Sequence, residues 1–202
     1  MNTCEYAGDP FQEPRSHPWV DSTTDASARY HDLTASPLLI RSALEDFTPW
    51  ARYGAIETFY TLLERLNHKH STLESNDCAF VGPHPNDEPS VSKALVCSGR
   101  VMVLFRALAR NVATLESDAI ESLKNELHRE LVTHDEAFRW GLVGTTVVPT
   151  RYLALPEANG QQLGTQLMIS FWAWGDTEAD TMLNLSRVFK NLARALRALS
   201  EL

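Results

Sequence analysis

The sequence predicts an α+β fold, with an antiparallel sheet of about four strands, N-terminal and central helices, and a long C-terminal amphipathic helix. Two neighbouring patterns near the end of the chain support this prediction. Residues 164–174 read GTQLMISFWAW, an apolar run typical of a strand, and Gly175 ends it. Residues 177–202 then repeat apolar side chains at helical spacing. A strand that leads directly into an amphipathic helix indicates a sheet packed against helices.

The C-terminal helix is the best specified element. Glu178 lies near its positive N-terminal end, as the helix dipole favours. Its apolar stripe is expected to be buried and consists of Met182, Leu185, Val188, Phe189, Leu192, Leu196 and Leu199. A basic stripe on the same helix consists of Arg187, Lys190, Arg194 and Arg197. Such cations can receive a carboxylate or a phosphate, although pairing with the surplus Asp and Glu residues is the simpler explanation.

The N-terminal residues 1–35 contain three prolines and show neither strand nor helix periodicity. We therefore expect an extended or mobile arm that contributes little to the core, followed by a single α+β domain over residues 36–202. In that domain a capping hydroxyl residue precedes a proline at Ser36 and again at Thr48. Each pair predicts the start of a helix, and the first helix is expected to end near Phe47.

Residues 77–82 and 93–97 are short apolar runs on either side of a loop rich in proline and polar residues, and they predict a hairpin. Residues 99–113 are ambiguous, because β-branched Val101 and Val103 favour a strand. A helix is favoured instead by five apolar side chains at helical spacing: Val101, Leu104, Phe105, Leu108 and Val112. We therefore predict a helix.

Three further signals complete the domain. Ser117 is expected to cap a central helix with one apolar face. Residues 140–155 predict a strand, which Pro149 confines to an edge or a bulge because proline cannot donate to a ladder. The stretch 158–160, Ala-Asn-Gly, predicts the turn into the strand at 164–174.

Charge and composition oppose several classes of function. A net charge of −8 disfavours non-specific binding to nucleic acid, because phosphate contacts need Lys and Arg. No apolar run approaches the roughly 20 residues that a membrane span needs, and the first residues do not resemble a signal peptide. The three cysteines, Cys4, Cys78 and Cys97, show no CxxC spacing, which favours a reducing, cytoplasmic location.

The common catalytic strings are absent, including GxSxG, GxGxxG, GxxxxGK[ST] and HExxH. The segment around Cys78 is the remaining candidate for catalysis or ligand binding. His84 can activate a thiol as its base, and Asp77 can orient that base. The simpler interpretation, which we favour, is a small buried cysteine in a strand.

Glu64 and His68 lie one helical turn apart, a spacing that suits a divalent metal ion. An ordinary solvated helix face is the simpler explanation of the pair, because it needs no further ligands. We therefore predict no metal site and no cofactor.

Trp172 and Trp174 are expected on the same face of the strand at 164–174, together with Met168. The opposite face carries apolar side chains at every second position from Leu167 to Ala173. It is the better core face because it has no polar residue. A bare pair of indoles favours association, so we expect either the N-terminal helices or a second subunit to cover the tryptophans.

These observations predict a soluble acidic accessory protein, chaperone-like or immunity-like, that binds a protein partner without catalytic activity. The alternative is a small-molecule-binding protein or an enzyme that uses the 74–84 loop, and a homodimer remains open as the assembly. Neither nucleic acid nor a membrane is expected as a partner. The candidate residues for binding a ligand or partner are Asp77, Cys78, His84, Arg100, Trp172 and Trp174.

Overall fold

Two antiparallel hairpins form most of the sheet in the computed structural model, which describes residues 1–5, 15–18, 30–114, 118–133, 135, 137–155 and 163–200. One hairpin pairs β3 (Leu73–Pro85) with β4 (Leu95–Phe105). The other pairs β5 (Gly141–Tyr152) with β6 (Leu163–Gly175). Because β4 and β6 also pair antiparallel, the strand order is β5-β6-β4-β3.

Two short N-terminal strands make the sheet mixed. Both β1 (Asn2–Glu5) and β2 (Arg15–His17) pair in parallel with β5, giving six strands in all among the described residues. The predicted purely antiparallel sheet of about four strands is therefore wrong. These strands hold four and three residues, too few to show a periodic pattern, and they gain their hydrogen bonds from a partner far along the chain.

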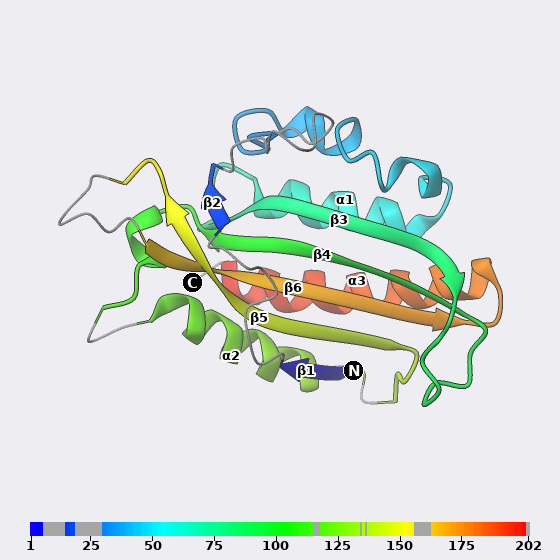
Figure 1. Ribbon diagram of the computed structural model, residues 1–202. Helices are drawn as coiled ribbons and strands as arrows, with labels where there is room; N and C mark the ends of the chain where they lie inside the picture. Colours follow the sequence, from blue (N-terminus) through cyan, green and yellow to red (C-terminus); the bar gives the residue numbers. More distant parts are fainter. Residues whose placement is uncertain are drawn as a thin grey trace.

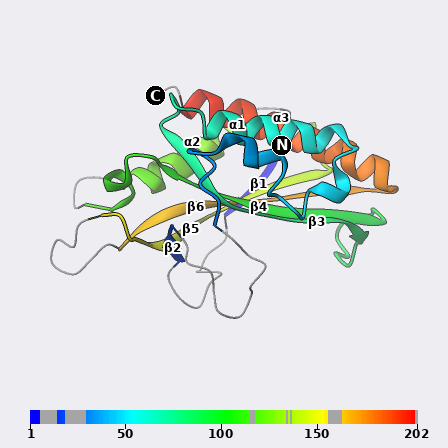
Figure 2. The same ribbon diagram turned by 90° about the horizontal axis from the view of Figure 1, so that it is seen from above.

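Three helices lie on one face of this sheet, as Figure 2 shows: α1 (Gly54–Leu66), α2 (Ala119–Val132) and α3 (Glu178–Ser200). The predicted long C-terminal helix is present. The helix predicted from Ser36 to Phe47 is wrong, because only a 3-10 turn forms there, at Pro37–Arg41. A second 3-10 turn occupies Thr48–Trp50, and α1 begins later than predicted.

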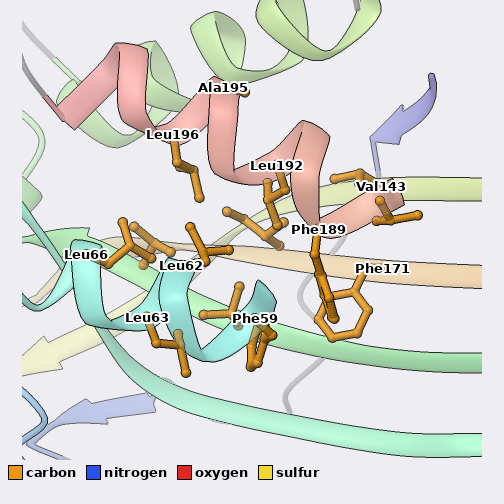
Figure 3. Packing of buried hydrophobic residues seen from close by; sticks show 14 of the residues in the cluster. Phe59, Leu62, Leu63, Leu66, Val143, Phe171, Phe189, Leu192, Ala195 and Leu196 are labelled. Carbon is orange, nitrogen blue, oxygen red and sulfur yellow. The ribbon is translucent and has the colours of Figure 1, made fainter. Parts of the chain in front are cut away.

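The main core lies between the helices and the sheet, and its centre is aromatic (Figure 3). The ring of Phe189 on α3 lies 4.7 Å from that of Phe59 on α1 and 4.8 Å from that of Phe171 on β6. The buried stripe predicted for α3 is confirmed, since all seven of its side chains are at most 8% exposed. Two helices and a central strand are thus held together by shared apolar contacts.

The helix predicted over residues 99–113 is wrong, because β4 extends through Phe105. Val101 and Val103 belong to the core beneath the helices, while Met102 packs in a small cluster on the other face. A strand that is apolar on both faces loses its alternation, so its apolar positions also fit helical spacing. The amide of Asn111 then hydrogen-bonds both the N–H and the C=O of Phe105, at 2.8 Å each, where the strand ends.

The described parts of the N-terminal 35 residues join the domain. Met1 is 5% exposed in the core, and its ammonium group donates a hydrogen bond to the carbonyl of Asp135 at 3.0 Å. The predicted arm and its boundary at residue 35 stay predictions, since residues 6–14 and 19–29 lie outside the described part. The predicted helix cap at Ser117 and the predicted turn at 158–160 also lie outside it. None of the helices in the described residues is long and apolar enough to cross a bilayer.

Candidate functional site

The sheet has a second face, opposite the three described helices, which we call the helix-free face (Figures 1 and 2). Strand pairing arranges its residues in rows that cross four strands. The first row, named here the apolar row, consists of Val81 on β3, Ser98 on β4, Trp172 on β6 and Leu142 on β5. The Val81 side chain is 56% exposed, and Trp172 and Leu142 are half-buried. Three apolar side chains thus line one partly accessible row.

Small residues dominate the second row, which consists of Ala79, Arg100, Ser170 and Gly144. Arg100 is the single long side chain of this row. Because paired residues share one face of a sheet, Arg100 lies diagonally beside Trp172, and Ser98 and Ser170 occupy the other diagonal. An aromatic ring and a guanidinium group therefore stand next to each other on this face.

Strand β2 lies across the next part of the helix-free face, on the side of the sheet away from α1 and α3 (Figure 2). Arg15 of β2 donates a hydrogen bond to the Asp77 carboxylate on β3 at 2.6 Å, and Arg100 reaches the same oxygen at 3.4 Å. Since β2 pairs with β5, this ion pair links the β5 side of the sheet to β3, the edge strand at its other side.

A buried polar cluster lies beneath β2. The His17 ring places Nε2 3.4 Å from the Glu74 carboxylate and Nδ1 3.1 Å from the amide nitrogen of Asn76. The Asn76 amide nitrogen also donates to Gln166 on β6 at 3.0 Å. His17 therefore contacts two side chains of β3 through its two ring nitrogens. These bonds satisfy buried polar groups and hold β2 on the sheet.

Two tyrosines border this cluster. Tyr152 is fully buried and donates a hydrogen bond to the carbonyl of Thr165 at 2.6 Å, and burial raises the pKa of its phenol. Burial also raises the pKa of Tyr30 to about 12, with the Asp32 and Glu74 carboxylates adding to the effect. Both phenols therefore stay protonated at neutral pH.

The structure separates Cys78 from His84. Cys78 pairs with Val101 on the core side of the sheet, while His84 pairs with Val96 and contacts the carbonyl of Gly82 through Nδ1 at 2.9 Å. Five residues along β4 separate the two partners, a distance of about 17 Å at the usual strand rise. Burial, with a smaller effect of Asp77, raises the pKa of the Cys78 thiol. The thiol therefore has neither a nearby histidine base nor a tendency to ionise.

The two tryptophans have different surroundings. Trp174 lies further along β6 than Trp172 and is 8% exposed, while Trp172 is half-buried in the apolar row. The described helices pack on the other face, so they do not cover these indoles. Of the six candidate residues, Asp77, Arg100 and Trp172 lie together on the helix-free face, and Cys78 lies on the opposite face.

In the described parts of the chain, no group of three or more His, Cys, Asp or Glu side chains is placed to hold a metal ion. The carboxylate of Glu64 instead accepts a hydrogen bond from Arg41 at 2.8 Å. The rings of His68 and His70 lie 5.3 Å apart, beyond the end of α1. Glu64 is thus engaged in a surface ion pair with Arg41.

Sequence reasoning missed Val81 and Leu142, the two ends of the apolar row. The only available signal was their place in alternating strands, and alternation does not reveal which residues stand opposite each other. That information comes from the register between strands, including the pairing of Ser98 on β4 with Trp172 on β6, which are distant in the chain. Comparison of the chain with protein-family models, with curated proteins and with solved structures finds no match.

Proposed function

We propose that this protein is a non-catalytic cytoplasmic accessory protein that binds a protein partner on the helix-free face of its sheet. The apolar row is the single observation that supports the proposal most strongly. It combines an edge-strand valine that is 56% exposed with half-buried Trp172 and Leu142. Partly exposed apolar side chains gathered on one face are typical of surfaces that bind another protein.

The chemistry of the neighbouring row suits a protein interface. Tryptophan and arginine are the side chains that most often contribute large shares of binding energy. Here Trp172 and Arg100 are diagonal neighbours, and the ion pairs with Asp77 supply a polar border. We expect a partner that presents an apolar side chain to Trp172. The net charge of −8 additionally favours the approach of partners with a basic surface.

The alternative of an enzyme that uses the 74–84 loop has less support. Its thiol and its histidine lie on different parts of β3, and the Asp77 carboxylate pairs with two arginines instead of orienting a histidine. The cytoplasmic location belongs to the same proposal and is supported by the cysteines at positions 4, 78 and 97, which are thiols and not disulfides.

Site-specific photocrosslinking in the native host tests this function. A photoreactive phenylalanine analogue replaces Val81 in one variant and Leu183 in a matched control. Leu183 is 70% exposed on α3, on the helix side of the sheet. We expect the Val81 variant to form a discrete adduct with one partner, identified by mass spectrometry, and the Leu183 variant to form none with that protein.

Charge substitutions then test whether the same row provides the binding energy. Val81→Asp should abolish co-purification of the crosslinked partner, while Leu183→Asp should leave it unchanged. Both sites are exposed, so both variants are expected to fold. An adduct of twice the chain mass identifies the partner as a second copy of this chain. Equal adducts at both positions, or none at Val81, would contradict the proposal.

A further inference from the structure

A groove between α1 and α3 lies on the helix side of the molecule, away from the apolar row. The two helices run in the same direction, because Tyr53 before α1 contacts Glu178 at the start of α3 and Phe59 stacks near Phe189. The groove encloses about 390 Å³, and Leu62 and Ala193 contribute apolar surface to it. Small-molecule sites in proteins commonly enclose about 300–1,000 Å³, so this volume suits a small ligand.

Four cationic side chains line the groove: Arg65 from α1, and Lys190, Arg194 and Arg197 from α3. The contact of Phe59 with Phe189 sets the alignment of the two helices. Arg65 lies six residues beyond Phe59 on α1. The same step beyond Phe189 on α3 falls between Arg194 and Arg197, so these side chains stand level with one another. The guanidinium groups of two helices therefore converge on one end of the groove.

The carboxylates near the groove are already engaged. Glu57 lines the groove and accepts hydrogen bonds from Arg41 at 2.7 and 2.8 Å, and Arg41 also binds Glu64. Among the described residues, Arg41, Arg65, Lys190 and Arg194 thus face these two carboxylates, which leaves a local excess of two positive charges. This excess occurs on a protein whose net charge is −8, so overall composition does not explain it.

Three of the cationic groups, Arg65, Lys190 and Arg194, have few partners among the described residues. Arg194 donates to the neutral amide oxygen of Asn191 at 3.0 Å. Within the described residues, the side chains of Arg65 and Lys190 form neither a hydrogen bond nor an ion pair. The hydroxyls of Thr58 and Thr61 donate to carbonyls of their own helix. The donors left to face a ligand are therefore the side chains of Arg65, Lys190 and Arg194.

The helix dipole favours a cation in the last turn of each helix and so explains Arg65 and Arg197. It does not explain Lys190 and Arg194, which precede the last turn of α3. Like charges placed side by side repel one another, and a bound anion relieves that repulsion.

We propose that this groove binds a small phosphate-bearing anion. Arginine presents paired N–H groups that match two phosphate oxygens, and a neighbouring lysine adds a point charge. Half-buried Ala193 offers an apolar surface to the organic part of such a ligand. This site is independent of the partner surface on the helix-free face, and its test can fail or succeed separately.

Isothermal titration calorimetry of the full chain with inorganic pyrophosphate tests the site. We expect saturable binding of one pyrophosphate. Arg65→Gln and Arg194→Gln should each weaken binding by about tenfold, since each removes a charge-assisted hydrogen bond. Arg129→Gln is the matched control, because Arg129 is an exposed arginine on α2 outside the groove. It should change the affinity by less than about twofold, the effect of removing one distant, screened charge.

Three results would overturn the proposal. One is the absence of saturable binding to the wild-type chain. Another is an equal loss of affinity in all three variants, which would show a non-specific charge effect. The third is binding of hexaglutamate in preference to pyrophosphate, which would assign the groove to an acidic peptide instead. Circular dichroism spectra of the variants confirm that each is folded.

Discussion

Replacing Phe189 by alanine tests how the helix layer is attached to the sheet. Phe189 is fully buried on α3, and its ring contacts Phe59 of α1 and Phe171 of β6 (Figure 3). The ring therefore joins three elements that are separate in the chain. Removing it leaves a cavity that rigid neighbours on three sides cannot refill.

The expected loss follows from burial and ring geometry. Core Phe→Ala substitutions cost about 3–5 kcal/mol. The ring of Phe189 meets Phe171 at 77° and Phe59 at 31°, and favourable aromatic pairs add about 0.5–1.5 kcal/mol each. We therefore expect a loss near the upper end of that range, about 5 kcal/mol. For a chain of this size such a loss lowers Tm by about 10–20 °C.

Urea unfolding, followed by far-UV circular dichroism, measures the free energy of unfolding. Leu183→Ala on the same helix is the control, because Leu183 is 70% exposed and should change stability by less than about 0.5 kcal/mol. The double variant with Phe59→Ala and Phe189→Ala should lose less free energy of unfolding than the sum of the two single losses, since the two rings share a contact. A loss below about 1 kcal/mol for Phe189→Ala would refute the packing argument.

Three further predictions concern single residues. Iodoacetamide should alkylate Cys78 slowly at neutral pH until the chain is unfolded, because burial raises its thiol pKa; fast labelling of the folded chain would contradict this. Hydrogen bonds from Arg187 lower the pKa of the Asp135 carboxyl in the folded chain. The ionised carboxylate therefore stabilises the fold above the unfolded pKa of about 3.9, and this stabilisation is lost as pH falls through the lower folded pKa. Wild type and Asp135→Asn should thus differ most in urea unfolding near neutral pH and converge in acid; a constant difference would exclude the ionic contribution. Gly99→Ala should cost about 1–3 kcal/mol, because its methyl group would clash with the backbone of β3 and with Phe171; a neutral effect by thermal unfolding would count against the register.

The sequence predicted most reliably those elements whose signal is local. The stripe of α3 repeats over 23 residues and is buried as expected. Strand β6 has Leu167, Ile169, Phe171 and Ala173 on its core face, again as expected. In both elements the pattern of one segment suffices, because its apolar face is wide and uninterrupted.

The misassigned segment at 99–113 shows where local patterns lose their meaning. Strand β4 lies between β3 and β6, and its residues are buried on both faces. Burial on both faces removes the polar alternation that distinguishes a strand from a helix. Its apolar residues therefore matched helical spacing by coincidence, and only pairing with two neighbouring strands determines its conformation.

The candidate site likewise combines residue types that the sequence reveals with contacts that it does not reveal. Sequence reasoning selected Trp172 and Arg100 as residue types suited to binding, and it paired Cys78 with His84 because they are close in the chain. The tertiary structure brings the first pair onto one face and separates the second along β4. Residue type and spacing are properties of the sequence, whereas the side of a strand and its opposite neighbour depend on register, which long-range pairing decides.

The same physical limit applies to β1, β2 and the groove between α1 and α3. Strands of four and three residues carry no periodic signal, and their hydrogen bonds come from β5, more than a hundred residues away. Arg65 and Arg194 become neighbours only when α1 and α3 pack side by side. The sequence by itself therefore determined amphipathic faces, charge and residue chemistry. The tertiary structure alone decided which of those faces meet, because contacts between distant segments depend on the packing of the whole chain.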